Sequence, residues 1–301
     1  MRAIQFNRFG DPEVLEVADL PDPHPGPGQI RVAVRAAAVN PIDWKVRSGM
    51  MGGELPQTTG REVAGVVDEL GDGVSDVAVG DRVFGFVAGG GGAAELALLA
   101  DYAPIPRSLS FAEAAALPVA VETAVRTLDL LGVTAGTSLL VNGAAGAVGS
   151  SATQLARLRG ARVIGTASPN NHDYLRSLGA EPTTYGDGLV ERVRELEPSG
   201  VDAALDAAGG GALAALVELA GGPERVVTIA DYAGAQATGA NFSGGLGTAR
   251  AVHALDEIGD LIEAGQFSLP VAREFSLEQI GEAHRLSEAG HVRGKLVLLI
   301  D

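Results

Sequence analysis

The feature that most constrains the fold is the stretch 138–149, SLLVNGAAGAVG. An apolar strand leads into a turn of small residues and then into a helical run from Ser150 to Arg159. Small side chains let backbone N–H groups approach a phosphate, and the helix N-terminus adds a partial positive charge. The stretch therefore predicts a cradle for the pyrophosphate of a nucleotide cofactor, formed by Ala144, Ala145, Gly146, Ala147, Val148 and Gly149.

The glycine pattern of this cradle matches the dinucleotide fingerprint G-x-G-x-x-G only loosely, because Ala144 stands where the first glycine is expected. A turn or a helix packing site is the alternative interpretation in a chain with 42 glycines. The context favours the cradle, since an apolar run at 162–166 follows the helix at the spacing of a βαβ unit.

The end of this second strand bears on which nucleotide binds. Proteins that bind NAD usually place Asp or Glu there to hold the ribose hydroxyls, and that carboxylate repels a 2'-phosphate. This chain has Ser168 and Asn171 instead, with His172 and Arg176 as candidate positive charges. The pattern favours NADP(H) over NAD(H). The alternative is that Ser168 and Asn171 cap a helix that begins near His172.

Composition excludes several classes of protein. The net charge of −16 opposes binding to nucleic acid or to an anionic membrane. The chain has no cysteine, which excludes thiolate nucleophiles and cysteine-ligated zinc, and its histidines have no metal-binding spacing. An apolar signal region and an 18-residue apolar span are both absent, so we expect a cytoplasmic protein that does not enter a membrane.

Two kinds of pattern alternate along the chain and predict two domains. Short strands and tight turns dominate the first third, as in the apolar run 30–39. Strands then alternate with helices, which predicts a parallel sheet with crossover helices. The apolar run 295–300 is expected to pair back with the N-terminal lobe. We therefore expect one domain from 1–118 and 267–301, and a nucleotide domain at 119–266.

Several motifs together resemble the zinc-free quinone oxidoreductase branch of the medium-chain dehydrogenase/reductases, which includes zeta-crystallin. They are FGDPEVL at 9–15, VNPIDWKVRSG at 39–49, GREVAGVV at 60–67, VGDRVF at 79–84, AAALP at 114–118, the cradle, and GHVRGKLV at 290–297. The resemblance implies an α/β protein with a GroES-like β-barrel catalytic domain and a Rossmann domain with a doubly wound parallel sheet. It also implies NADPH as cofactor and a quinone or an α,β-unsaturated carbonyl (enone) as substrate.

The resemblance also implies site residues. Zinc-dependent relatives hold their metal where this chain has Asn40 and Arg61, so we expect no metal. Asn40 is expected near the nicotinamide, and Asp43 is expected to hold the loop or to orient a proton-donating water. The alternative for Asp43 is a cap on the turn after Pro41. The further cofactor positions are Thr123, Tyr185, Ala208, Gly209, Ile229, Ala230, Asp231, Phe242, Ser243 and Gly244.

Other interpretations stay open. One is an enoyl-thioester or biosynthetic tailoring reductase, and another is a non-catalytic NADPH-binding protein. RNA binding, a side function of some relatives, is disfavoured by the negative charge. The resemblance implies a homodimer joined through edge strands of the nucleotide domain, for which we expect the apolar segment 226–229 to serve. His284 lies in an expected helix and is expected to be exposed or hydrogen-bonded.

Overall fold

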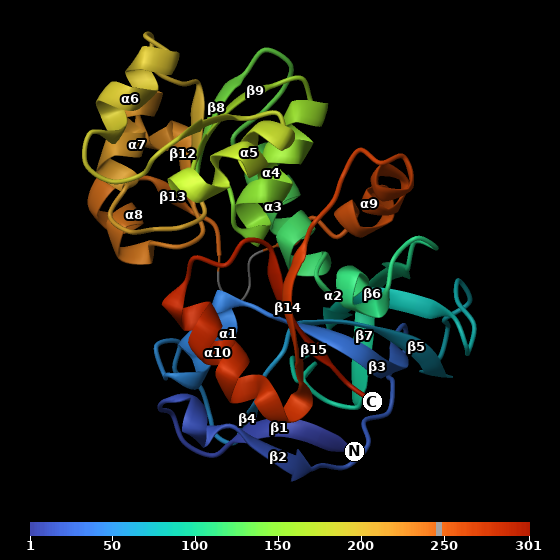
Figure 1. Ribbon diagram of the computed structural model, residues 1–301. Coiled ribbons are helices and arrows are strands. Elements are labelled where there is room, and N and C mark those ends of the chain that lie inside the picture. Colours follow the sequence, from blue (N-terminus) through green and yellow to red (C-terminus); the bar gives the residue numbers. More distant parts are fainter. Residues whose placement is uncertain (245–248) are drawn as a thin grey trace. The chain divides into compact units, whose positions relative to one another are not determined.

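Two units form the computed structural model, which describes residues 1–244 and 249–301 (Figure 1). Unit 1 comprises Met1–Val119 and Val252–Asp301, and unit 2 comprises Ala120–Ala251. The sequence analysis assigned 252–266 to the nucleotide domain, whereas the structure places this segment in unit 1. The reason is local packing: helix α9 (Ala254–Glu263) contacts β7 (Leu96–Pro104), and Glu263 accepts hydrogen bonds from the backbone and hydroxyl of Ser108 at 3.2 and 3.0 Å.

Unit 1 is built on two β-sheets. One has the strand order β2-β1-β4, and the other has the order β14-β15-β3-β5-β6-β7 with an additional β3–β7 pairing that closes it toward a barrel. Besides β7 and α9, the elements are β1 (Arg2–Phe6), β2 (Glu16–Asp19), β3 (Ile30–Val39), α1 (Pro41–Arg47), β4 (Gln57–Thr58), β5 (Glu62–Leu70), β6 (Arg82–Val87), α2 (Phe111–Ala115), β14 (Val271–Ser276), α10 (Ile280–Ala289) and β15 (Lys295–Leu299).

The closed sheet encloses the core of unit 1. Strand β3 alternates buried residues such as Ile30, Val32 and Val34 with less buried ones, as expected for a strand with one face on a core. The last strand, β15, pairs antiparallel with β3, which confirms the predicted return of the chain to its N-terminal lobe. Ser110 caps α2 by accepting from the N–H of Glu113 at 3.2 Å.

Unit 2 contains one six-stranded parallel sheet with the order β10-β9-β8-β11-β12-β13. This is the strand order of a Rossmann domain. The elements are α3 (Pro118–Leu130, which begins in unit 1), β8 (Ser138–Asn142), α4 (Ala147–Leu158), β9 (Arg162–Thr166), α5 (His172–Ser177), β10 (Glu181–Thr183), α6 (Leu189–Leu196), β11 (Ala203–Asp206), α7 (Leu213–Ala220), β12 (Val226–Thr228), α8 (Tyr232–Thr238) and β13 (Asn241–Phe242).

Helices cover both faces of this sheet, as a doubly wound fold requires. Helices α3, α4 and α5 lie on one side, and α6, α7 and α8 lie on the other (Figure 1). The apolar residues of α6 and α7, including Val193 and Leu216, pack with Leu140 and Ile164 of the sheet. The expected α/β architecture, with a β-barrel lobe and a parallel-sheet domain, is confirmed.

One expectation about the sheet is wrong. We expected the segment 226–229 at an exposed edge, but β12 lies between β11 and β13, and Val226 and Val227 are fully buried. Its apolar character reflects an inner strand of a sheet that is covered on both faces. The edge strand next to β12 is β13, where Phe242 is partly exposed, and β10 forms the opposite edge.

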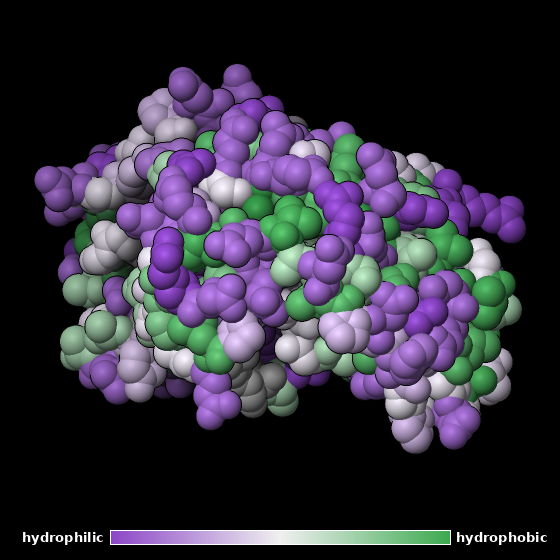
Figure 2. Space-filling view, turned by 90° about the horizontal axis from the view of Figure 1, so that it is seen from below, coloured by the Kyte–Doolittle hydropathy of each residue, from purple (hydrophilic) through white to green (hydrophobic). Residues whose placement is uncertain are grey.

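On the face drawn in Figure 2, hydrophilic residues are interspersed with hydrophobic ones. Within residues 1–244 and 249–301, the helices are all too short or too polar to cross a bilayer.

Candidate functional site

The predicted cradle has the geometry of an anion site at a helix N-terminus. Strand β8 ends at Asn142, and α4 begins at Ala147, three residues earlier than expected. The N-cap is Gly146, which has no side chain to cap the helix. The N–H of Ser150 donates to the Gly146 carbonyl at 2.8 Å, so the N–H groups of the first turn precede the regular helical bonds and face outward from the helix end. These groups and the helix dipole suit a pyrophosphate.

Glycine is required at two positions of this turn. A Cβ at Gly149 would lie 2.2 Å from the carbonyl oxygen of Gly143, so only glycine lets the helix pack this closely on the turn. Gly143 itself has φ +81°, in the left-handed region. At Gly146, a Cβ would meet only the Gly143 oxygen at 3.5 Å, an ordinary contact. Packing within the chain therefore does not require glycine at position 146. Its missing side chain leaves room beside the N-terminus of α4.

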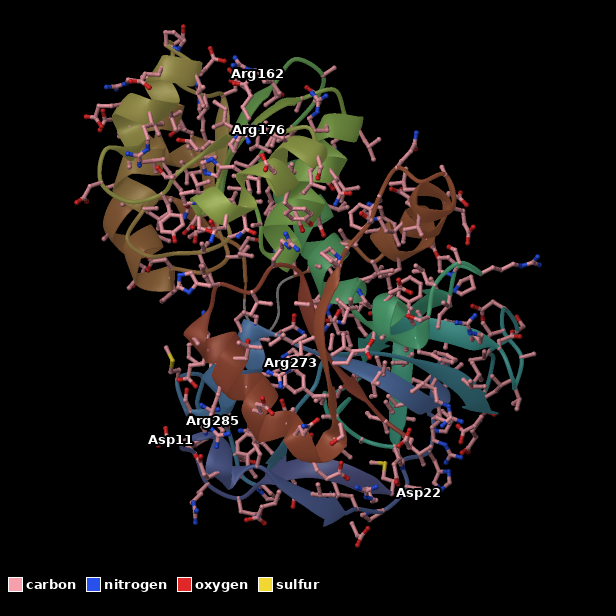
Figure 3. The ribbon with its side chains drawn as sticks, viewed as in Figure 1. Asp11, Asp22, Arg162, Arg176, Arg273 and Arg285 are labelled. Atoms are coloured by element: carbon pink, nitrogen blue, oxygen red, sulfur yellow. The ribbon has the colours of Figure 1, made fainter. Side chains whose placement is uncertain are left out.

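The loop after β9 lacks a carboxylate where NAD-binding proteins place one. Ser168 and Asn171 bond to one another, with the Asn171 amide donating to the Ser168 hydroxyl at 3.2 Å. Neither side chain caps the following helices, so the capping alternative does not describe this loop. His172 Nε2 lies 3.3 Å from the carbonyl oxygen of Ala167. Arg176 on α5 is exposed and pairs with Asp173 at 2.6 Å (Figure 3).

The structure brings two predicted cofactor residues, Thr123 and Ser243, to one ion pair. Arg126 contacts Glu122 at 2.6 Å, donates to the carbonyl of Ser243 at 3.2 Å and also contacts the Ser243 hydroxyl. The Thr123 hydroxyl donates to Glu122 at 3.2 Å. The sequence analysis missed both Glu122 and Arg126, although their i, i+4 spacing on a helix is a recognisable pairing signal.

The other predicted cofactor residues fall into two groups. Ala208, Gly209, Ala230 and Asp231 follow strand ends at the carboxyl edge of the sheet, but their N–H groups are bonded to the side chains of Asp206 and Thr228 and are not free for a ligand. Ile229 donates its N–H to the Asp206 carbonyl. Tyr185 and Phe242 are half exposed, and the Phe242 ring meets that of Tyr232 edge-on at 5.1 Å; Gly244 follows β13.

In unit 1, the two predicted catalytic residues are buried and fully hydrogen-bonded. The Asp43 carboxylate accepts from the N–H of Asn40 at 2.7 Å and from the N–H of Gly60 at 3.4 Å. Burial raises the pKa of Asp43, because desolvation outweighs these N–H groups and the nearby charge of Arg61, which lower it. The contact with Asn40 is that of a capping box at the start of α1, as the capping alternative expects, and the contact with Gly60 ties the loop to the segment before β5.

Asn40 belongs to a cluster with Glu62 and Lys295 that the sequence analysis missed. The Asn40 amide NH₂ donates to Glu62 at 2.8 Å, and the amide oxygen accepts from the Lys295 ammonium at 2.7 Å. The same ammonium lies 2.7 Å from a carboxylate oxygen of Glu62. The second Glu62 oxygen accepts from the N–H of Val119 at 2.7 Å. Lys295 is one of only two lysines in the chain, and a lysine that opens an apolar strand was the available signal.

This cluster does not fit a metal ion at the position where zinc-dependent relatives hold one. The Asn40 oxygen already faces an ammonium group, and Arg61, at the other ligand position, is a cation that cannot coordinate a metal. In the part of the chain that the structure describes, three or more His, Cys, Asp or Glu side chains do not gather anywhere as a metal site would require.

The expectation for His284 is wrong. The side chain is fully buried in α10, and neither ring nitrogen has a hydrogen-bond partner among the described residues. Burial, together with the charge of Arg47, lowers the pKa of His284 to about 3. The helix turns this residue toward the core of unit 1, which a prediction of helix alone does not reveal.

Comparisons with known proteins support the architecture. The alcohol dehydrogenase GroES-like domain model matches residues 26–107, and the zinc-binding dehydrogenase model matches residues 178–298. The quinone oxidoreductase of Rattus norvegicus is 39% identical over 217 residues, 65% of this chain and 66% of that protein. The polyketide synthase system protein NorB of Streptomyces orinoci is 38% identical over 290 residues, 90% of this chain but 13% of that protein. The chain thus spans less than two thirds of these curated relatives.

Solved structures match over the whole chain. The quinone oxidoreductase from Coxiella burnetii is 32% identical with a TM-score of 0.86, covering 100% of this chain and 99% of that one. An NAD-dependent alcohol dehydrogenase is 33% identical with a TM-score of 0.87, covering 100% of both chains. A mycobacterial protein in complex with NADPH is 27% identical with a TM-score of 0.85, covering 99% of this chain and 100% of that one. The chain belongs to the medium-chain dehydrogenase/reductase superfamily, in its quinone oxidoreductase branch.

Proposed function

We propose that this chain is an NADP(H)-dependent reductase that transfers a hydride to a quinone or to an α,β-unsaturated carbonyl without a metal. The observation that carries the proposal is the uncapped start of α4 behind a turn of small residues. This arrangement fits a dinucleotide pyrophosphate. Bound nicotinamide would supply the hydride, and the residues of this chain would bind and orient it.

The preference for NADP(H) is supported by the loop after β9. A 2'-phosphate would meet the Ser168 hydroxyl and the Asn171 amide there and no carboxylate close to the strand end. The first acidic residue of the segment is Asp173, which is exposed and paired with Arg176. One related structure is that of an enzyme named as an NAD-dependent alcohol dehydrogenase, and another is a complex with NADPH.

The reaction type follows from the chemistry of unit 1. Alcohol oxidation in this superfamily uses a metal as Lewis acid, and the Asn40 cluster does not fit one. Conjugate addition of hydride to a quinone or enone requires less electrophilic activation than alcohol oxidation does, because the acceptor is already electron-poor. Asn40 and Asp43 are proposed residues of the substrate end, with Asp43 holding the loop in place.

The test is oxidation of NADPH by the purified chain, followed at 340 nm with a panel of quinones and enones in the presence of a chelator. We expect turnover with NADPH to exceed that with NADH and to be insensitive to the chelator. If the protein binds neither nucleotide in a fluorescence titration, the proposal is wrong. Binding without turnover of any acceptor would indicate a non-catalytic NADPH-binding protein.

A glycine substitution separates binding from folding. Gly146→Ala is sterically tolerated within the chain, since its Cβ meets only an oxygen at 3.5 Å, but the methyl group would crowd a phosphate at the start of α4. We expect an unchanged Tm and a Kd for NADPH raised roughly tenfold or more. Gly259→Ala in α9, where a Cβ meets Pro106 at 3.6 Å, is the matched control and should change neither quantity.

An enoyl-thioester reductase is the second candidate, favoured by the match to a polyketide synthase protein over 90% of this chain. The two functions differ in the acceptor that gives the higher kcat/KM. Crotonyl thioesters of N-acetylcysteamine or coenzyme A should be poor acceptors beside quinones if the first proposal is correct. The reverse order would establish the second.

A homodimer and a cytoplasmic location are also proposed. The edge strands of the parallel sheet are β10 and β13, and we propose β13 for pairing with a second copy because it lies beside β12, the strand of the expected segment 226–229. Light scattering coupled to gel filtration would show the mass of a dimer, and a monomer at micromolar concentration would contradict this. Fractionation of the source cells tests the location.

A further inference from the structure

Four neighbouring strands of unit 2 each end in a buried polar residue. These residues are Asn142 on β8, Thr166 on β9, Asp206 on β11 and Thr228 on β12, and each is at most 3% exposed. Since the strands are parallel, their carboxyl ends meet at one edge of the sheet. The four side chains form a continuous chain of hydrogen bonds across that edge, which we call the polar ladder.

The direction of each bond in the polar ladder is defined by its chemistry. The Thr166 hydroxyl donates to the Asn142 side-chain oxygen at 2.7 Å. The Asn142 amide then donates to one oxygen of Asp206 at 2.9 Å, and the Thr228 hydroxyl donates to the other at 2.8 Å. An Asp carboxylate only accepts, so this order of donors and acceptors is the one that satisfies every member.

The polar ladder also binds the first N–H groups of the loops that follow the strands. Thr166 accepts from the N–H of Gly143 at 3.0 Å, where the turn of the cradle begins. Asp206 accepts from the N–H groups of Ala208 and Gly209 at 3.2 and 2.8 Å.

At the far end, the Thr228 hydroxyl accepts from the N–H groups of Ala230 and Asp231, both at 3.1 Å. Three loops, at 143–146, 207–211 and 229–231, are thus held by one connected set of side chains.

The carboxylate at the centre of the ladder is unusual in lacking a cation. Asp206 is fully buried, and in the described ranges it forms no ion pair. Its charge is balanced by hydrogen bonds from Asn142, Thr228, Ala208 and Gly209. Burying a charge in this way is costly for stability alone, and an apolar set of strand ends would avoid that cost. The ladder is therefore best explained by the loop geometry that it imposes.

We propose that the polar ladder is a positioning device that holds the three loops in the conformation that binds the nucleotide before the nucleotide arrives. This inference rests on the proposed function and adds to it residues that touch the loops and not the ligand. Preorganised loops lose less conformational freedom on binding, which raises affinity. One of the three loops, 143–146, is the turn of the pyrophosphate cradle, and the pyrophosphate is common to both nucleotides, so we expect the ladder to act on NADPH and NADH alike.

The test uses the Thr228 hydroxyl, whose removal frees two backbone N–H groups of one loop. Thr228→Val keeps the shape of the side chain but removes the hydroxyl, and Thr228→Ser keeps the hydroxyl. Thr127→Val removes a buried hydroxyl of α3 whose partners among the described residues are two carbonyl groups of its own helix. Val193→Ala in α6 destabilises the core of unit 2 without touching the ladder.

The first measurement needs no nucleotide. In hydrogen exchange followed by mass spectrometry, we expect Thr228→Val to accelerate exchange in 207–211 and 229–231, and Thr228→Ser to restore protection. Val193→Ala should leave the relative protection of these loops unchanged. Wild-type protection of both loops in Thr228→Val would overturn the proposal.

The second measurement is the Kd for NADPH and for NADH at 25 °C. We expect Thr228→Val to raise both roughly tenfold or more and by similar factors, with binding restored in Thr228→Ser. Thr127→Val and Val193→Ala should stay within about twofold of the wild type. A Thr228→Val protein with wild-type Kd values would show that the ladder serves stability alone. If the wild-type protein binds neither nucleotide, the proposed function fails, whatever the exchange data show.

Discussion

The two units solve the same problem, a buried carboxylate, in different ways. In unit 1, Glu62 is neutralised by the ammonium of Lys295, and Asn40 bridges the two groups. In unit 2, Asp206 pairs with no cation among the residues that the structure describes, and it accepts from two side-chain and two backbone donors. Both carboxylates are fully buried.

The difference teaches what each cluster is suited for. The charged cluster ties distant segments together, since Lys295 lies 255 residues from its hydrogen-bond partner Asn40. Among the described residues, the backbone group that Glu62 holds is the N–H of Val119. Hydrogen bonds from successive N–H groups define the path of a loop residue by residue. The charged cluster therefore stabilises the packing of unit 1, and the polar ladder defines loop shape in unit 2.

The largest effect is expected from Lys295→Met. Without the ammonium, Glu62 is left as a buried charge whose donors, within the described part of the chain, are the Asn40 amide and the Val119 N–H. The free energy of unfolding should fall by about 3–5 kcal/mol, measured by urea denaturation. Lys45→Met, at the chain's other lysine, is the control and should cost much less. Equal losses in the two variants would show that the buried ion pair contributes nothing specific.

Asp206→Asn should have the next largest effect. An amide is a weaker acceptor than a carboxylate, and its NH₂ group faces donors, so part of the hydrogen bonding is lost. We expect a loss of about 1.5–3 kcal/mol in unfolding free energy, and a higher Kd for NADPH. Asp202→Asn is the matched control, because that carboxylate also accepts from a backbone N–H and a hydroxyl, those of Ser138, but is exposed. If Asp206→Asn changed neither the free energy of unfolding nor the Kd for NADPH, the polar ladder would not define loop shape, and the contrast with the charged cluster of unit 1 would be wrong.

A third buried group, His284, carries no charge at neutral pH and should make unit 1 sensitive to acid. Its pKa is lowered to about 3 in the folded protein, against about 6.5 when unfolded. As the pH falls below about 6.5, the unfolded state binds the proton first, so the free energy of unfolding declines between pH 6.5 and 3. Above pH 6.5 this group causes no loss of stability. The loss should reach about 2 kcal/mol at pH 5.

His284→Leu should flatten this decline, and the exposed His253→Leu should not. Urea denaturation at pH 7 and at pH 5 makes the comparison. An unchanged pH dependence in His284→Leu would assign the acid sensitivity to another group.

The smallest effect on stability is expected from Arg176→Ala, which removes an exposed positive charge and tests whether that charge contributes to binding of NADPH. The pair of Arg176 with Asp173 is exposed, so no resolvable change in Tm should follow. If Arg176 meets the 2'-phosphate, the Kd for NADPH should rise by about three- to tenfold while that for NADH stays constant. A parallel change in both would mean that Arg176 does not select the cofactor.

Local patterns predicted much of the fold. The boundaries of β3 and β9 agree with the expected ranges, and the sequence around Ala144 correctly predicted a strand, a turn and a helix. The edge position of 226–229 was wrong, because an apolar run does not reveal whether a strand lies inside a sheet or at its border. The roles of Glu62, Lys295 and Asp206 were missed because each depends on partners from other elements.

The amino-acid sequence alone determined where most helices and strands form and that the turn before α4 needs small residues. Those depend on hydrophobic period, capping and steric contact between near neighbours. Only the tertiary structure decided that four strand ends form one polar ladder and that a lysine is buried beside Asn40. The physical reason is that a buried polar group must find its partner through the fold, and the partners of Asp206 include Asn142, 64 positions away in the chain.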